Sequence, residues 1–278
     1  MNILLLGAKG QLGVDLVSVL GGDHDLTAWD VDELDITDLD AVVGAARAIK
    51  PDLILNAAAY TDVDGCESHE ELAYRVNALG PRNLAIGAME TGAGILHIST
   101  DFVFDGEKKT PYLEFDETNP QSVYGKTKLA GEQAVREITP RHYILRTAWL
   151  YGPHGRNFVK TMLRLASERD SVSVVADQVG TPTATADLID AIRAVMGSGA
   201  YGTYHATCEG ACSWYDFAAA IFRHAGVSTK VEPITTEALG RPAKRPAYSV
   251  LDNFMLRHQR GVTLRDWESA LCAYMKNS

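Results

Sequence analysis

Two residues of the stretch SVYGKTK, at positions 122–128, are able to carry out proton chemistry. Tyr124 and Lys128 are four positions apart, so both side chains would stand on one face of a helix. A phenol with its ordinary pKa of about 10 is a poor acid at neutral pH, and a neighbouring ammonium group lowers that pKa. The same pattern also occurs in exposed helices, where a lysine lies over an aromatic ring. The pair by itself leaves both roles open.

Two hydroxyls and a carboxylate come together in STDFVFDG, at positions 99–106. The preceding apolar residues 95–99 predict a buried strand, and open α/β sheets bind ligands at the carboxyl ends of their strands. Thr100 lies 24 residues before Tyr124. A turn closed by side-chain hydrogen bonds is the structural alternative for this stretch.

Glycines recur at every third position in GAKGQLG, residues 7–13. The stretch lies between a predicted strand over 2–6 and a predicted helix over 11–20. A glycine-rich turn there lets the backbone approach a pyrophosphate, whose charge the helix N-terminus stabilises. The spacing differs from the G-x-G-x-x-G of typical dehydrogenases. The residues that we expect at a dinucleotide are Gly7, Gly10, Gln11, Leu12 and Gly13.

An aspartate closes the second predicted strand, residues 26–30. Asp30 lies 17 residues beyond Gly13, where a carboxylate can hydrogen-bond an adenosine ribose. A carboxylate there repels a 2′-phosphate, which favours NADH over NADPH. Lys9, in the glycine loop, is a nearby cation that could reach such a phosphate and soften the preference. Capping of a helix or turn is the alternative role for Asp30.

Strands and helices alternate along the first half of the chain. Further strands are expected over 53–56, 95–99 and 143–147, and helices over 38–50 (with Asp38 as N-cap), 67–91, 124–138 and 157–169. This order predicts an α/β fold with a doubly wound, mainly parallel Rossmann sheet. Beyond residue 150 the pattern loosens into short strands such as 171–175 and helices such as 184–196 and 214–224. We expect a dinucleotide-binding Rossmann domain over 1–150 and a smaller α/β substrate lobe over 151–278, some segments of which return to the first domain.

Bulk properties argue against several classes of function. The 278 residues carry a net charge of −10, whereas a general nucleic-acid binder needs a positive field. No apolar stretch approaches the roughly 20 residues of a membrane span, and MNILLLG lacks the basic region of a signal peptide. The four cysteines form no CxxC pair and no zinc spacing, which predicts free thiols in a reducing compartment. We expect a soluble cytoplasmic protein with no nucleic-acid or membrane partner.

The order of the motifs resembles the extended short-chain dehydrogenase/reductases, and within them the dTDP-4-dehydrorhamnose reductase family. The run STDFVFDG followed by YGKTKLAGE, residues 124–132, is the most specific part of the match. The match is weaker over 186–240 and at the C-terminus. The other matching segments are MNILLLGAKGQLG, LDITD (34–38), PDLILNAAAYTDVDGCE (51–67), NALGPRNLA (77–85), RTAWLYG (146–152), NFVKTMLRLA (157–166), DQVGTPT (177–183) and RPAYS (245–249).

The resemblance implies a reaction and assigns residues to it. The reaction is reduction of the C4 keto group of dTDP-4-dehydro-β-L-rhamnose to dTDP-β-L-rhamnose by NADH or NADPH, the last step of dTDP-rhamnose synthesis. Tyr124 would donate the proton, Lys128 would bind the nicotinamide ribose and tune Tyr124, and Thr100 would hydrogen-bond the developing alkoxide. Asp101 and Trp149 would contact the sugar; packing is the alternative for Trp149. The implied cofactor contacts also include Asp35, Ile36, Ala57, Ala58 and Ala59.

Two of these segments also have an ordinary structural reading. The small residues of NAAAY, positions 56–60, suit either a bulky ligand at a strand end or close helix–sheet packing. The segment RPAKRP, positions 241–246, offers Arg245 to a substrate diphosphate, but a solvated basic loop has the same composition.

Other functions are compatible with parts of the pattern. Dehydratases of the superfamily carry Thr-Asp-Glu where this chain has Thr100-Asp101-Phe102, and phenylalanine does no acid–base work. A reductase or epimerase of another nucleotide-linked keto sugar remains open, as does a binding protein like the regulatory subunit of methionine adenosyltransferase. Some family members dimerise around Mg²⁺ held by glutamates, where this chain has the shorter Asp15 and Asp187. We therefore expect no metal, and either a monomer or a homodimer.

Overall fold

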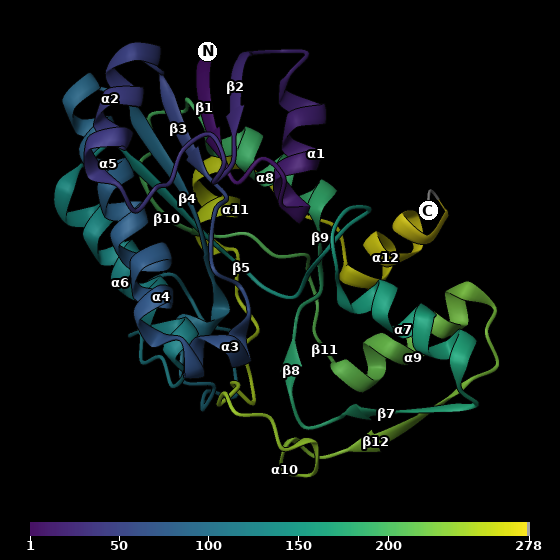
Figure 1. The fold of residues 1–278 in the computed structure, drawn as a ribbon. Coiled ribbons are helices and arrows are strands. Elements are labelled where there is room, and N and C mark those ends of the chain that lie inside the picture. Colours follow the sequence, from purple (N-terminus) through teal and green to yellow (C-terminus); the bar gives the residue numbers. More distant parts are fainter. Residues whose placement is uncertain (277–278) are drawn as a thin grey trace.

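A six-stranded parallel sheet forms the centre of the computed structural model, which describes residues 1–276 (Figure 1). In spatial order its strands are β10 (Gly202–His205), β5 (His142–Thr147), β4 (Gly94–Thr100), β3 (Leu53–Asn56), β1 (Asn2–Leu6) and β2 (Asp25–Trp29). β2 lies on one side of β1, and every later strand of this sheet lies on the other side. The order therefore reverses between β1 and β3, which is where ligands bind in doubly wound folds. The predicted fold class is confirmed.

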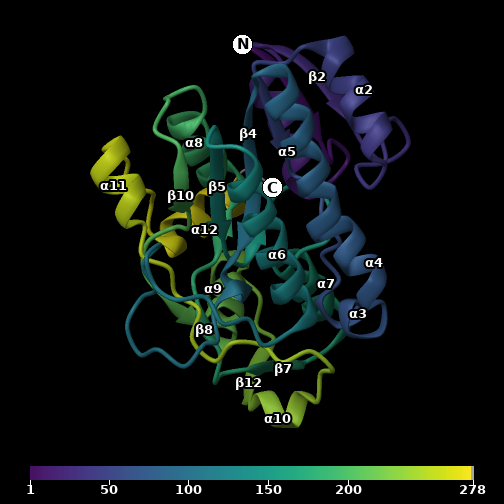
Figure 2. The same cartoon turned by 90° about the vertical axis from the view of Figure 1, so that its left-hand side faces the viewer.

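Helices cover both faces of the sheet, as the turned view shows (Figure 2). On one face of β1, Leu4 and Leu6 pack in a core with α2 (Leu39–Ile49), α5 (Gly80–Thr91) and α6 (Val123–Ile138). On the other face, Ile3 and Leu5 pack in a second core with α1 (Gln11–Leu20), α8 (Thr185–Val195) and α11 (Phe254–Arg260). Successive strand residues point to opposite faces, so an unbroken apolar strand serves both cores.

A smaller lobe has a core of its own. It contains α7 (Phe158–Glu168), α9 (Trp214–Ala225) and α12 (Trp267–Lys276), with the parallel pair β7 (Ser171–Val175) and β12 (Lys230–Ile234) (Figure 1). Its short segments are β6 (Leu150–Tyr151) with β9 (Thr183–Ala184), β8 (Val179–Gly180) with β11 (Cys212–Ser213), and α10 (Thr236–Leu239). From the C-terminal half, β10 is the edge strand of the large sheet, and α8 and α11 pack against that sheet. Within residues 1–276, no helix is long and apolar enough to cross a membrane.

The expected element bounds hold closely for most of the chain. The strands over 2–6, 53–56 and 171–175 are confirmed to the residue, and Asp38 caps α2 through a hydrogen bond from the Ala41 amide. The second strand lies one residue earlier than predicted: it spans Asp25–Trp29, and Asp30 follows it. The four cysteines are free, and Cys272 is the one among them that is not buried.

The prediction of one helix over 67–91 is wrong. The segment is divided into α3 (Val63–Ser68), α4 (Glu70–Tyr74), a π-helical turn over Arg75–Leu79, and α5. His69 lies between α3 and α4 and interrupts the helix there, because its φ of −126° and ψ of 51° are not helical. At the π turn, the buried Asn77 donates to the Tyr60 carbonyl and to the Thr127 hydroxyl, and accepts from the Tyr60 amide. Helical periodicity could not reveal these contacts with residues far away in the chain.

A buried ion pair ties α6 to the sheet. The Arg146 guanidinium on β5 donates to both carboxylate oxygens of Glu132 on α6, at 2.9 and 2.7 Å. Ser99 on β4 donates to the same carboxylate at 2.6 Å, and Arg136 adds a further contact at 2.7 Å. Glu132 is 0% and Arg146 2% exposed. Burial opposes ionisation of Glu132, but these donors outweigh it and hold its pKa below the usual range.

We expect Glu132→Gln to lower the free energy of unfolding by about 3–5 kcal/mol, because it leaves the Arg146 charge buried without a carboxylate. Urea unfolding of the two proteins measures the difference. Glu168→Gln is the matched control: Glu168 pairs with Arg164 at the surface and should change stability by about 0.5 kcal/mol or less. A loss below about 1 kcal/mol for Glu132→Gln would show that the pair is not a structural constraint.

Candidate active site

Two adjoining cavities open at the carboxyl ends of the strands. The first, of about 470 Å³, lies beyond β1, β2 and β3; the second, of about 480 Å³, lies beyond β4 and β5. Gly10, Ala57 and Ala59 line both, so the two form a continuous groove past the glycine loop. The first is also lined by Gly7, Asp30, Asp35, Ile36 and Ala58, and the second by Gln11, Leu12, Thr100, Asp101, Tyr124, Lys128, Trp149 and Arg245.

The glycine loop is shaped for close backbone approach. Gly7 has φ +80°, and a Cβ there would lie 2.7 Å from the Ala58 amide nitrogen. A Cβ on Gly13 would lie 2.0 Å from the Gly7 carbonyl oxygen. Gly13 is not among the residues that line either cavity. Its lack of a side chain allows the first turn of α1 to pack against the glycine loop. The first turn of α1 holds no acidic residue and its N-cap, Gly10, has no side chain, which suits an anionic pyrophosphate.

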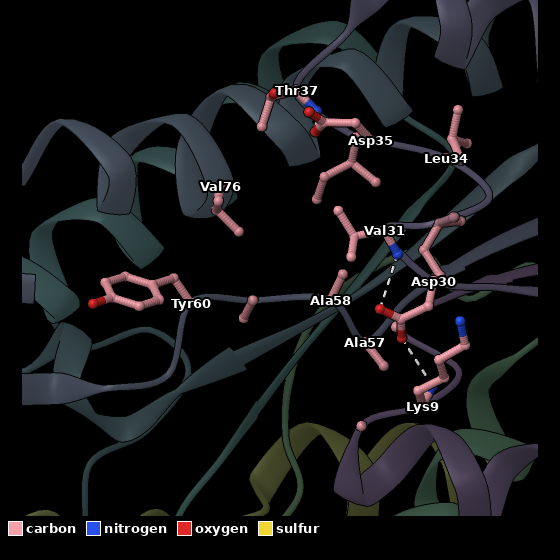
Figure 3. A pocket seen from close by; sticks show the side chains of 15 residues that line it. Lys9, Asp30, Val31, Leu34, Asp35, Thr37, Ala57, Ala58, Tyr60 and Val76 are labelled. Atoms are coloured by element: carbon pink, nitrogen blue, oxygen red, sulfur yellow. Dashed lines mark hydrogen bonds between the residues drawn. The ribbon is translucent and has the colours of Figure 1, made fainter. Parts of the chain in front are cut away.

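Asp30 lies on the wall of the first cavity, where its two carboxylate oxygens accept from the backbone amides of Lys9 and Val31 at 2.9 and 2.8 Å (Figure 3). The Lys9 ammonium is paired with Asp32 at 2.7 Å and with Glu33 at 3.4 Å. The nearby cation noted in the sequence is therefore already paired with two carboxylates. The carboxylates that line this cavity are those of Asp30 and Asp35.

Helix α6 brings Tyr124 to the end of β4. Ser122 caps the helix by accepting from the Gly125 amide at 3.1 Å. A Cβ on Gly125 would lie 2.2 Å from the Phe102 carbonyl oxygen, so glycine allows the helix to touch the turn after β4. Tyr124 consequently lies edge-on to the Phe102 ring, with centroids 5.5 Å apart, and hydrogen-bonds with the Thr100 side chain.

Lys128 is buried, which excludes the exposed-helix alternative. Its side chain is on the second cavity yet the residue is 2% exposed, and its ammonium donates to the Ile98 carbonyl at 2.6 Å. His97, also buried, has its Nε2 atom 3.5 Å away. Burial lowers the pKa of Lys128 to about 8, against the opposing effect of Glu132. The pKa of Lys128 therefore lies close to neutral pH.

The pKa of Tyr124 moves in the direction opposite to our expectation. Burial raises it above the ordinary phenol value, the Asp101 carboxylate raises it further, and the hydrogen bond with Thr100 opposes both. The sequence-based prediction that Lys128 lowers this pKa is not supported, since the Lys128 ammonium points to the Ile98 carbonyl. Tyr124 therefore keeps its proton at neutral pH, as a proton donor must.

Trp149 lies stacked on Trp214, with ring centroids 3.5 Å apart and planes 9° from parallel. Its φ of +47° is rare for a bulky residue, and a Cβ on Gly180 would lie 2.6 Å from its ring. Trp214 also lines the second cavity, and sequence reasoning missed it. The signal was available: Ser213 and Asp216 form a capping box, which sets Trp214 as the first residue of α9.

The two aspartates considered for a metal have other partners. Asp15 lies 3.4 Å from the His154 ring, and Asp187 accepts two hydrogen bonds from Arg265. Over residues 1–276 no group of three or more potential ligands has a geometry suited to a metal ion.

Comparison with known proteins places the chain in a family. The family model described as "RmlD substrate binding domain" matches residues 1–278. The chain belongs to the RmlD family. A crystal structure of a dTDP-4-dehydrorhamnose reductase from Clostridium acetobutylicum is 52% identical to this RmlD-family chain, covers 100% of it with 99% of its own length, and superposes with a TM-score of 0.97.

Two other relatives of this RmlD-family protein are informative. The structure of a dTDP-4-dehydrorhamnose reductase from Bacillus anthracis, a complex with NADP, is 42% identical, covers 99% of each chain and has a TM-score of 0.97. A Streptomyces antibioticus protein named "Probable dTDP-4,6-dihydroxy-2-methyloxan-3-one 4-ketoreductase" is 46% identical over 98% of this chain and 93% of its own.

Asp101 gives the site a measurable pH signature. Burial raises the pKa of its carboxyl to about 6, although hydrogen bonds with Ser249 and Thr100 oppose the shift. Because the folded state then holds this proton more tightly than the unfolded chain does, the contribution of Asp101 to stability is lost as the pH rises through about 6.

Relative to Asp101→Asn, the unaltered protein should therefore lose roughly 2–3 kcal/mol of unfolding free energy between about pH 4 and pH 8. Urea unfolding of both proteins across this range gives the difference. Parallel pH profiles would mean that Asp101 is not held in a protonated state by its surroundings.

Proposed function

We propose that this protein reduces the C4 keto group of dTDP-4-dehydro-β-L-rhamnose to dTDP-β-L-rhamnose with NADH or NADPH. The observation that carries the proposal is one arrangement: Thr100, Tyr124 and Lys128 face a cavity that is continuous with the groove at the glycine loop. A nucleotide sugar and a nicotinamide cofactor in these two cavities would meet at those three side chains.

The roles follow from the environment of each group. Tyr124, whose pKa burial raises, holds the proton that it gives to the carbonyl oxygen at C4. Thr100 hydrogen-bonds with the Tyr124 side chain and lies where it can stabilise the oxygen as charge develops there. Lys128, fixed by the Ile98 carbonyl, orients the ribose next to Tyr124. The bound cofactor would supply the hydride.

The residues of the first cavity fit a dinucleotide. The cramped glycine loop and the amides at the start of α1 would hold the pyrophosphate, with Ala57, Ala58 and Ala59 against its other side. Asp35 and Ile36 also line this cavity and would contact the adenosine. Asp30 would accept from the ribose hydroxyls through the remaining lone pairs of its carboxylate.

The second cavity supports a sugar with a flat apolar contact. Trp149 cannot rotate freely between Gly180 and Trp214, so it presents a fixed indole to the sugar beside Asp101. Arg245 reaches the same cavity from the C-terminal half and suits a diphosphate.

A sibling reaction is the second candidate, because one relative at 46% identity is named as a ketoreductase of a different dTDP-linked sugar. Both candidates require the same Tyr124, Lys128 and Thr100. The cytoplasmic location and the monomeric or homodimeric state expected from the sequence are part of the proposal, and the free cysteines support the former.

The first prediction concerns the cofactor. Because the carboxylates of Asp30 and Asp35 line this cavity, the KM for NADH should be lower than that for NADPH, whose 2′-phosphate meets them. Asp30→Ala should raise the KM for NADH more than the KM for NADPH. Steady-state assays with both cofactors measure the two effects, and equal changes would remove Asp30 from the ribose site.

The second prediction concerns the reaction itself. Tyr124→Phe removes one hydroxyl from a site formed mainly by packing, so the fold and NADH affinity should stay nearly unchanged while kcat falls by about 10²–10⁴-fold. The assay follows NADH oxidation with dTDP-4-dehydro-β-L-rhamnose and, in parallel, with GDP- and UDP-linked keto sugars.

Tyr201→Phe is the matched control, since Tyr201 is a surface residue that accepts a hydrogen bond from Arg141 and lines neither cavity. Turnover of Tyr124→Phe at the original rate would rule out Tyr124 as the proton donor. A kcat/KM at least about tenfold higher for a GDP- or UDP-linked sugar would replace the proposed substrate.

A further inference from the structure

A third cavity, of about 390 Å³, adjoins the catalytic one in the smaller lobe. Trp214 and Arg245 line both cavities and so mark the junction between them. The third cavity has apolar walls from α7, β7 and α9, with Phe158, Met162, Leu165, Val172 and Val174 among them. On the proposed function, a nucleotide sugar would extend from the sugar site through this junction, which places its diphosphate next to Arg245.

Asp64, on α3, reaches this junction from the large domain. Its Oδ1 accepts from Arg245 Nη1 at 3.0 Å and its Oδ2 from Arg245 Nη2 at 2.9 Å. The same carboxylate accepts from the Ala243 amide at 3.2 Å and lies 3.5 Å from Arg241 Nη1. Asp64 and Arg245 are each 21% exposed at the side chain, so the pair is mostly shielded from water. One carboxylate thus binds three groups of a loop that belongs to the C-terminal half.

The geometry of the pair leaves part of the guanidinium available. Asp64 binds the end of the fork, through Nη1 and Nη2, and Nη1 also donates to the Ala243 carbonyl at 3.4 Å. The guanidinium carries five N–H donors in a fixed plane. Among the described residues, Arg245 Nε has no recorded acceptor. Arg245 is therefore held at one edge and can offer the Nε edge to a planar or tetrahedral anion.

We propose that Asp64 is a positioning residue for substrate binding: it fixes Arg245 at the junction of the two cavities so that the free edge of its guanidinium grips the diphosphate of a nucleotide sugar. This inference rests on the proposed function and adds a residue on α3 to the substrate site. It also explains why a carboxylate, which repels a diphosphate, lies beside the anion-binding loop.

Two effects of Asp64 oppose each other and predict opposite results. As a neighbouring anion, Asp64 weakens diphosphate binding, so its removal would strengthen binding. As an anchor, it aligns a bidentate donor and holds Arg241 and Arg245 near each other despite their like charges. Misplacement of such a clamp by about 1 Å can cost up to about 10²-fold, which exceeds the effect of one partly screened charge. Anchoring should therefore dominate.

The experiment compares the full-length protein with Asp64→Asn, which keeps the size and one acceptor but loses the charge and the second acceptor. Two quantities are measured: steady-state kinetics with dTDP-4-dehydro-β-L-rhamnose, and the Kd of dTDP by calorimetry. We expect the sugar-nucleotide KM and the dTDP Kd to rise about tenfold or more, with kcat and the KM for NADH within about twofold of the original. Asp23→Asn is the control for charge alone, since Asp23 pairs with the surface residue Arg193.

A second variant tests the coupling. Lysine cannot make the bidentate pair, so in an Arg245→Lys background Asp64→Asn should have little further effect on the dTDP Kd. If Asp64→Asn does not fold, Asp64→Glu decides instead: its extra methylene displaces the guanidinium, and the dTDP Kd must rise at least about threefold.

The outcomes separate this inference from the proposed function. An unchanged or lower dTDP Kd in the Asp64 variants would overturn the positioning role, and so would an equal rise in the KM for NADH. If the unaltered protein bound no dTDP, the positioning role of Asp64 would be overturned as well. An original protein that binds dTDP but reduces no dTDP-linked keto sugar would refute the proposed function, while the dTDP Kd values would still decide the role of Asp64.

Discussion

The close contact between helix α6 and the carboxyl end of β4 is the constraint on which the site depends. Gly125 lets the helix touch the Phe102 carbonyl, and the buried pair of Glu132 and Arg146 fixes the helix about two turns further along. Since Tyr124 and Lys128 precede Glu132 on the same helix, this anchoring sets where their polar ends lie. A lysine buried to this degree is costly unless its ammonium is hydrogen-bonded, and here the Ile98 carbonyl accepts a hydrogen bond from it.

Burial at this contact also shifts the pKa values of three neighbouring groups. Burial raises the pKa of Tyr124 and of Asp101 and lowers that of Lys128, so each group moves toward its neutral form. Tyr124 therefore holds its proton at neutral pH, whereas Asp101, with a pKa of about 6, is mostly ionised there. The expected lowering of the phenol pKa by lysine needs the ammonium to face the phenol, and α6 directs it toward β4 instead.

Much of the fold was predictable because it rests on local patterns. The five early strands are short, mostly apolar runs, and the glycine loop separates the first of them from α1. Asp38 is a typical N-cap residue and marks the start of α2. The π turn was not predictable, because Asn77 binds Tyr60 and Thr127, which are 17 and 50 residues away. The candidate site divides in the same way. Its strand-end residues were found from motif order. The pairing of Asp64 with Arg245 was not found, because it joins positions 181 residues apart, and neither was the pairing of Lys9 with Asp32.

The central claim is that hydride reaches C4 of a dTDP-linked keto sugar while the proton comes from Tyr124. The most direct test is isotope transfer: NADH deuterated at nicotinamide C4, on the face that the enzyme uses, is incubated with dTDP-4-dehydro-β-L-rhamnose in ordinary water, and the product is analysed by NMR. We predict one deuterium per product at sugar C4, with a hydroxyl proton that exchanges with solvent. Deuterium at another carbon, or sugar conversion without oxidation of NADH, would contradict the account.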